Sequence, residues 1–207
     1  MTQSLPSGLT KPSLWWSDEL GYGWHSAPPM QYSGEYFAHY QKLDETPMGA
    51  ALTKARLELV EKYTKASLGV DIGIGGGRYV KESWGNGYDV SSEAVEWLQH
   101  IYSYVDPYIA PVDHITCWDS LEHIPEPEKL LANVRDWFFV SLPTFENAEE
   151  ARASKHFKPA EHLWYFSIPG LIRWAEDQGF QVMEVNHAET ELGREGITSF
   201  AFKRIQA

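Results

Sequence analysis

The feature that most constrains the fold of this chain is a short apolar run that ends in a cluster of glycines. Residues Leu68–Ile72 lead into Asp71-Ile-Gly-Ile-Gly-Gly-Gly77. A buried strand followed by such a turn lets a ligand approach the backbone, because no side chain stands in the way. The turn also leaves backbone N–H groups free at the start of the next helix. The pattern predicts a strand, turn and helix that bind a nucleotide-like ligand, although a tight turn that binds nothing has the same pattern.

Strand and helix patterns alternate after this cluster, which predicts an α/β fold with helices on both faces of the sheet. We expect a doubly wound, mostly parallel seven-stranded sheet with a terminal antiparallel hairpin. The strands expected after the first are Gly87–Val90, Ser103–Asp106, His114–Trp118, Trp137–Leu142, Gln181–Asn186 and Ser199–Ile205. The helices expected between them are Glu93–Tyr102, Glu128–Val134 and a segment that Ser167 caps and Gly179 ends.

The N-terminal part of the chain has a different character. Its first thirty residues show no lasting period and are rich in Pro, Gly and aromatic residues. We expect residues 1–48 to form an aromatic arm or lid, irregular at first and then helical over Glu35–Leu43. Residues 49–207 are expected to form one ligand-binding domain that begins with an amphipathic helix over Gly49–Tyr63. Within it, the aperiodic segment 144–165 is expected to be a lid-like insertion.

Composition excludes some partners. A formal net charge of -12 argues against binding to extended duplex nucleic acid, which needs a dense Lys and Arg surface. The single cysteine, Cys117, leaves no internal disulfide and fits a reducing cytoplasm. No apolar run is long enough to cross a membrane. We therefore expect a cytoplasmic protein without a membrane partner.

An acidic residue at the end of the second expected strand narrows the ligand class. From that place the carboxylate of Asp89 can accept both hydroxyls of a ribose, which favours a nucleoside ligand. Dinucleotide dehydrogenases place their third glycine in a G-x-G-x-x-G pattern, whereas Arg78 stands at that position here. An NAD-dependent oxidoreductase is therefore the less favoured alternative.

Three motifs in the expected order carry a family resemblance. Asp71–Gly77, Gly87–Val90 and Asp113–Pro127 resemble the first, second and fourth-strand motifs of class I S-adenosylmethionine-dependent methyltransferases. The stretch Leu121-Glu-His-Ile is similar to the branch that includes the ubiquinone-pathway O-methyltransferases. The resemblance implies a Rossmann-like fold, S-adenosylmethionine as cofactor, and methyl transfer to a hydroxyl or amine of a small molecule or of RNA. A non-catalytic binding or partner protein of the same fold is the alternative.

The resemblance also implies roles for individual residues on the cofactor side. Gly73, Gly75 and Gly77 would cradle the methionine part, with Asp71 beneath them. Asp89 would bind the ribose, and Val90 would pack on the adenine. The remaining residues with implied cofactor contacts are Asp106 at the adenine amino group, and Asp119 and Ser120 beside the sulfonium.

The acceptor side is expected around Glu122 and His123. Asp119, Glu122 and His123 follow the spacing i, i+3, i+4, so they converge on one face of a helical turn. Together with His162 they have the donor types of a Mg, Mn or Zn site. The favoured interpretation has no metal: Glu122, His123 and Tyr36 line the acceptor pocket, and His123 or His162 acts as general base. The methyl acceptor is left unidentified.

Overall fold

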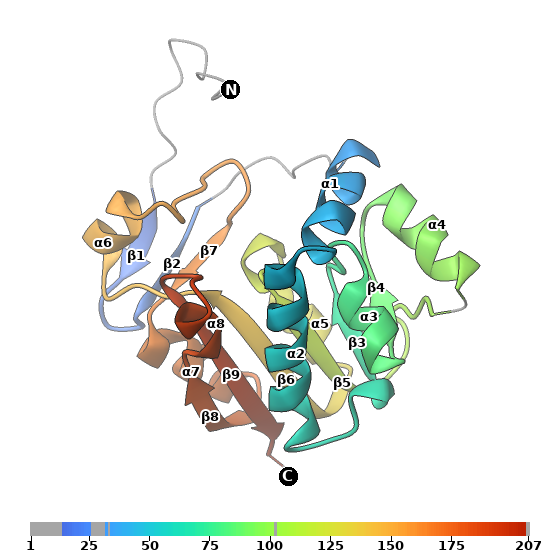
Figure 1. The fold of residues 1–207 in the computed structure, drawn as a ribbon. Coiled ribbons are helices and arrows are strands. Elements are labelled where there is room, and N and C mark those ends of the chain that lie inside the picture. Colours follow the sequence, from blue (N-terminus) through green and yellow to red (C-terminus); the bar gives the residue numbers. More distant parts are fainter. Residues whose placement is uncertain (1–13, 26–31, 33, 102, 206–207) are drawn as a thin grey trace.

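The computed structural model describes residues 14–25, 32, 34–101 and 103–205 (Figure 1). Its centre is a six-stranded sheet in the order β4-β3-β5-β6-β9-β8. Strands β4 to β6 run parallel, and β9 pairs antiparallel with both β6 and β8. The strands are β3 (Gly69–Ile72), β4 (Asn86–Tyr88), β5 (Val112–Trp118), β6 (Val134–Pro143), β8 (Phe180–Asn186) and β9 (Ile197–Arg204). The predicted α/β class with a terminal antiparallel hairpin is confirmed.

The expected strand Ser103–Asp106 differs from the prediction. It contributes one isolated parallel bridge, between Gly87 and Tyr104, so the sheet has six strands where seven were expected. Two hydrogen bonds join it to the edge strand, from Gly87 N to the Ser103 oxygen and from Val105 N to the Gly87 oxygen. Pro107 follows at once, and a residue without an N–H cannot continue the ladder.

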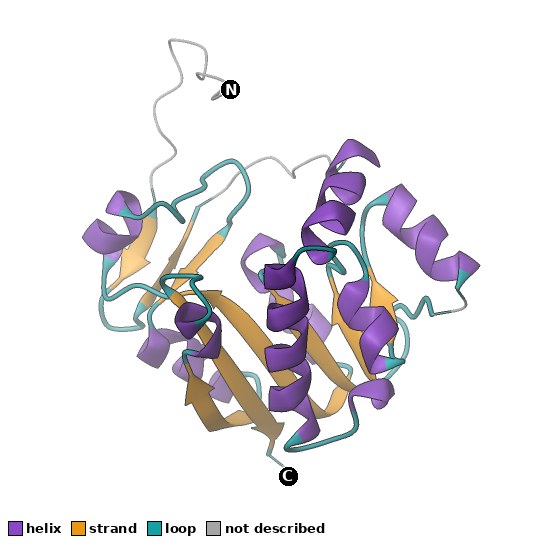
Figure 2. Ribbon diagram, viewed as in Figure 1, coloured by secondary structure: helices purple, strands orange, loops and turns teal. Residues whose placement is uncertain are grey.

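Helices cover both faces of the sheet (Figure 2). Successive side chains of β6 point to opposite faces of the sheet. Trp137 and Phe139 pack with Leu59 of α2 on one face, whereas Phe138 packs with residues of α5 and α7 on the other. The helices are α1 (Gly34–Asp44), α2 (Pro47–Glu61), α3 (Arg78–Ser83), α4 (Ser92–His100), α5 (Pro127–Leu131), α6 (Ala148–Ala153), α7 (Ile168–Asp177) and α8 (Ala188–Glu191), with 3-10 turns η1 (Ala66–Leu68) and η2 (Leu121–His123). Within the described ranges, no helix is long and apolar enough to cross a bilayer.

Local signals set the starts of several helices. The Ser91 and Ser167 hydroxyls accept hydrogen bonds from the first turns of α4 and α7, as their N-cap positions predict. Helix α5 is shorter than the expected Glu128–Val134, because Val134 already belongs to β6. Tyr102, the expected end of α4, lies outside the described residues.

The expectation of an irregular N-terminal segment was wrong for residues 15–24. Strands β1 (Trp15–Ser17) and β2 (Tyr22–Trp24) pair antiparallel with each other and with β7 (Trp164–Phe166). They form a second, three-stranded sheet next to the main sheet (Figure 1). The segment 144–165 likewise contains α6 and the start of β7. Strands of three residues are too short to show a period, and their partner is distant in sequence.

Candidate active site

One large cavity opens at the carboxyl ends of the parallel strands. Its volume is about 1370 Å³, and its lining includes the ends of β3, β4, β5 and β6 together with one side of α1. Pockets for a single small ligand measure roughly 300–1,000 Å³. The cavity is therefore large enough to hold two ligands side by side.

The glycine loop lies between β3 and α3, and its backbone needs glycine. Gly73, Gly75 and Gly77 have φ angles of 71°, 56° and 86°, which side chains rarely adopt. A Cβ on Gly73 would lie 2.9 Å from the Cβ of Ser120, so the loop touches the segment after β5. Gly73 and Gly75 line the cavity. Gly77, immediately before α3, packs instead against the ring of Trp97 from α4.

Asp89 lies beside this loop, immediately after β4. Its two carboxylate oxygens accept hydrogen bonds from Ile74 N (3.0 Å) and Ser91 N (2.8 Å). These bonds fix the carboxylate at the cavity wall, and burial raises its pKa above the ordinary value. Val90, next in the chain, lines the cavity with an exposed apolar side chain (70% exposed). An acidic acceptor thus stands next to an apolar surface.

Asp71 lies on β3, two residues before the first glycine of the loop. Its side chain is buried and accepts a hydrogen bond from the Thr116 hydroxyl at 2.7 Å. Burial raises its pKa to about 7, although the Thr116 hydrogen bond and the Arg56 charge act in the opposite direction. Asp71 still reaches the cavity lining under the glycine loop.

Asp106 is not brought to the cavity. Its carboxylate accepts a hydrogen bond from Tyr108 N at 2.9 Å and closes the turn after the edge bridge. The Tyr108 ring lines the cavity in this region, and Asp106 is not among the lining residues of the described chain. The adenine contact of Asp106 stays a prediction that this placement does not favour.

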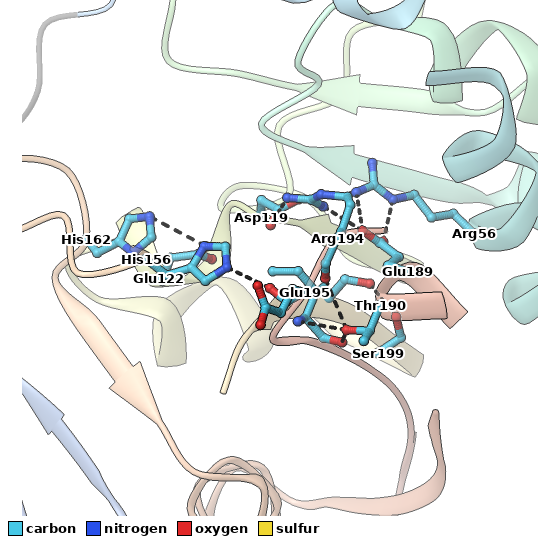
Figure 3. A network of polar contacts seen from close by, with 12 residues as sticks. Arg56, Asp119, Glu122, His156, His162, Glu189, Thr190, Arg194, Glu195 and Ser199 are labelled. Atoms are coloured by element: carbon cyan, nitrogen blue, oxygen red, sulfur yellow. Dashed lines mark hydrogen bonds and ion pairs between the residues drawn. The ribbon is translucent and has the colours of Figure 1, made fainter. Parts of the chain in front are cut away.

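Asp119 belongs to a network of two acids and two arginines (Figure 3). Arg194 contacts both of its carboxylate oxygens, at 2.6 and 3.0 Å, and Arg56 contacts one of them at 3.2 Å. The same arginines bind Glu189, which is 1% exposed. Burial alone would raise the pKa of Asp119, but Arg194 and Arg56 hold it below the ordinary value. Its charge is therefore already balanced within the protein.

Glu122, His123 and His162 meet at the far end of the cavity. One ligand atom of each lies within 4.8 Å of the others, and His162 Nε2 is 3.9 Å from Glu122 Oε1. Burial raises the pKa of Glu122 to about 8 and lowers that of His162 to about 3. Burial also lowers the pKa of His123. Both imidazoles are thus neutral at neutral pH, and Ser120 lies between this end and the glycine loop.

Aromatic residues from distant segments complete the walls. Trp24 and Trp164 have ring centroids 5.8 Å apart and both line the cavity. Tyr36 lines it from α1. Asp44 ties α1 to the glycine loop, because its carboxylate accepts a hydrogen bond from Arg78 N at 3.0 Å.

The residues of this site that sequence reasoning missed include His25, Asp44, Arg56 and Arg194. Each reaches the cavity through contacts between segments far apart in the sequence. No local spacing marks them, so no signal in the single sequence could have found them.

This geometry defines a class of protein. A glycine turn after the first parallel strand and an acid at the end of the second are typical of nucleoside-binding α/β sites. The sequence model of a methyltransferase domain family matches residues 37–185, well over half of the chain. The chain belongs to this family and is a class I S-adenosylmethionine-dependent methyltransferase. The finer resemblance to the ubiquinone-pathway branch stays a prediction.

Solved structures agree with this fold at low sequence identity. The partner of the Trm112 methyltransferase activator from Haloferax volcanii has a TM-score of 0.60 and 15% identity, over 84% of this chain and 97% of that one. A methyltransferase from Aquifex aeolicus has a TM-score of 0.56 and 16% identity, over 84% and 100%. The magnesium protoporphyrin IX methyltransferase of Synechocystis, with bound S-adenosylmethionine, has a TM-score of 0.52 and 12% identity, over 85% and 87%. No curated protein sequence matches the chain.

Proposed function

We propose that this methyltransferase transfers the methyl group to a hydroxyl or amine of a small molecule. The observation that carries the proposal is the single cavity that runs from Gly73 and Asp89 to Glu122 and His162. Its volume of about 1370 Å³ exceeds what one small ligand fills. A cofactor end and an acceptor end can therefore be assigned within it.

The cofactor end consists of the glycine loop and Asp89. The positive φ angles of Gly73 and Gly75 keep side chains out of the space above β3, as a bound nucleoside requires. Asp89 would accept the ribose hydroxyls, and Val90 would pack on the adenine. Asp71 would lie beneath the methionine part, with Gly77 supporting the loop from behind. When bound, S-adenosylmethionine supplies a methyl group on a positively charged sulfur.

The boundary between the two ends lies at Asp119 and Ser120. The Ser120 side chain touches the glycine loop, which supports its predicted place beside the sulfonium. Asp119 would act there through its position rather than as a free charge, since Arg56 and Arg194 neutralise it.

The acceptor end consists of Glu122, His123, His162 and the aromatic walls with Tyr36. Neutral imidazoles can accept a hydrogen bond, and then a proton, from an attacking hydroxyl or amine. The pKa of His162 falls to about 3, which makes it a weak base, so His123 is the better proton acceptor of the two. Most of the rate would come from holding the acceptor in line with the methyl group.

The charge distribution favours a small acceptor over RNA. The chain carries 29 acidic against 17 basic residues, Lys and Arg together. The two arginines at the cavity, Arg56 and Arg194, already pair with Asp119 and Glu189. They are therefore not free to neutralise phosphates, which dominate affinity for nucleic acids.

We also propose that residues 1–48 and 144–165 together close the cavity, as an N-terminal lid and an insertion on the domain that residues 49–207 form. The pairing of β2 with β7 supports this, since it joins the two segments directly. The lining contributed by Trp24 and Trp164 supports it further.

Methyl transfer can be tested with S-adenosylmethionine that carries a tritiated methyl group. The purified protein is incubated with it and with a cell extract that has been divided by size into small molecules, RNA and protein. We expect label in the small-molecule fraction, and none with a Gly75→Val variant. Label that appears only in the RNA fraction would overturn the choice of acceptor but not the transferase activity.

A further inference from the structure

The acceptor end of the cavity contains a carboxylate that the protein itself does not satisfy. Glu122 is 2% exposed, and neither of its carboxylate oxygens has a hydrogen-bond partner among the described residues. Nδ1 of His123 is likewise buried without a partner in the described chain. Buried polar atoms are nearly always paired, so such a cluster points to a ligand.

Backbone hydrogen bonds fix the two segments that carry this cluster. Glu122 and His123 lie on the 3-10 turn η2, which His123 N closes by a hydrogen bond to the Ser120 oxygen. Leu163 N donates a 2.7 Å hydrogen bond to the backbone carbonyl oxygen of Glu122, which fixes the neighbouring His162 against the turn. Figure 3 shows His162 directed at Glu122.

We propose that Glu122, His123 and His162 bind one divalent transition-metal ion at the acceptor end. Their ligand atoms lie within 4.8 Å of one another, so small rotations about the side-chain bonds bring all three onto one ion. One carboxylate with two imidazoles is a donor set that Zn²⁺, Mn²⁺, Fe²⁺ and Co²⁺ accept. Mg²⁺ prefers oxygen ligands and fits this set less well.

Asp119 is excluded from this ligand set, although the sequence spacing had included it. Arg194 and Arg56 occupy its carboxylate oxygens, and the group of ligand atoms formed by the described residues does not contain it. The site therefore has three protein ligands. Three ligands leave coordination positions open towards the cavity, which is the arrangement of catalytic rather than structural metal sites.

An open metal site would change the chemistry of the proposed methyl transfer. A hydroxyl group of the acceptor that joins the ion at an open position loses its proton more easily. In the metal-loaded protein the two imidazoles act as ligands, and the general-base role proposed for His123 applies only to the metal-free protein. This consequence rests on the proposed function, whereas binding of the ion itself does not.

Cobalt binding tests the site without any acceptor. Metal-free protein is titrated with Co²⁺, and the visible absorption of bound cobalt is recorded alongside calorimetry. We expect one Co²⁺ per chain, with Zn²⁺ competing for it. Glu122→Gln keeps the size of the side chain but cannot lose a proton to become a carboxylate ligand, and should weaken binding at least 100-fold. His162→Asn should do the same.

A matched control removes an imidazole elsewhere. His100 lies in the last turn of α4 and is exposed, so His100→Asn should leave Co²⁺ affinity within threefold of the parent. S-adenosylhomocysteine binding is measured for every variant, because it reports a folded cofactor end independently of the metal. Undiminished Co²⁺ binding by Glu122→Gln, or no binding by the parent while S-adenosylhomocysteine still binds, would overturn the metal site and leave the proposed function standing.

Discussion

Replacing Asp89 with asparagine removes one negative charge from the cofactor end of the cavity and keeps the size of the side chain. The carboxylate already accepts Ile74 N and Ser91 N through different oxygens. Each oxygen keeps a further lone pair for a ribose hydroxyl. Asparagine has only one acceptor oxygen, so it cannot serve both backbone donors and both hydroxyls.

The size of the effect follows from the hydrogen bonds lost. A hydrogen bond to a charged group contributes about 1.5–3 kcal/mol. Losing one ribose hydrogen bond should therefore raise the dissociation constant for S-adenosylhomocysteine by about 10-fold to 100-fold. One backbone N–H also loses its partner, which lowers the free energy of unfolding by about 1–3 kcal/mol.

Calorimetric titration with S-adenosylhomocysteine measures the affinity, at a temperature well below the unfolding midpoint of each variant. Asp106→Asn is the matched control, since Asp106 also accepts a backbone N–H but lies away from the cavity. We expect its affinity to equal that of the parent. The assignment of the ribose to Asp89 is refuted if the dissociation constant of Asp89→Asn for S-adenosylhomocysteine lies within threefold of that of the parent. It is also refuted if Asp106→Asn binds S-adenosylhomocysteine more weakly than Asp89→Asn does.

Three further substitutions test the loop, the ion pairs and the core. Gly75→Val places a branched side chain at φ 56°, inside the cavity, and should abolish S-adenosylhomocysteine binding by calorimetry; unchanged affinity would contradict the cradle. Arg194→Met leaves Asp119 and the buried Glu189 short of a partner, and urea unfolding should show a loss of about 3 kcal/mol. His114 is buried with its pKa lowered from 6.5 to about 4, so its contribution to stability, complete above pH 6.5, falls by about 3 kcal/mol as the pH drops to 4. Between pH 7 and pH 4, the free energy of unfolding of His114→Phe should therefore rise by that amount relative to the parent. If the difference in free energy of unfolding between the two proteins is the same at pH 7 and pH 4, this explanation is wrong.

The sequence was most informative where structure depends on neighbouring residues. The turn at Gly73 to Gly77 and the caps Ser91 and Ser167 could be predicted, because the chemistry of a turn or a cap lies within a few residues. The acid after the second strand was found for the same reason. These elements form the end of the cavity that we propose binds the cofactor.

The acceptor end depends on contacts that no local pattern contains. Spacing placed Asp119 with Glu122 and His123, but Arg194 lies 75 residues further along and holds Asp119 in the ion-pair network. The expected third strand ended at Pro107 after one bridge. Strands β1 and β2 were missed because their pairing with β7 is a property of the folded chain.

The pairing of β2 with β7 also sets an order in which the two ends of the cavity can form during synthesis. The glycine loop and Asp89 lie within residues 73–89, so these parts of the proposed cofactor end are synthesised early and close together. The acceptor wall joins Trp24 to Trp164, so it cannot form until Trp164, 75 residues after Asp89, has left the ribosome. Contacts between distant segments form late, because a long loop must close first. On a nascent chain, the glycine loop and Asp89 therefore become available well before the wall that encloses an acceptor can form.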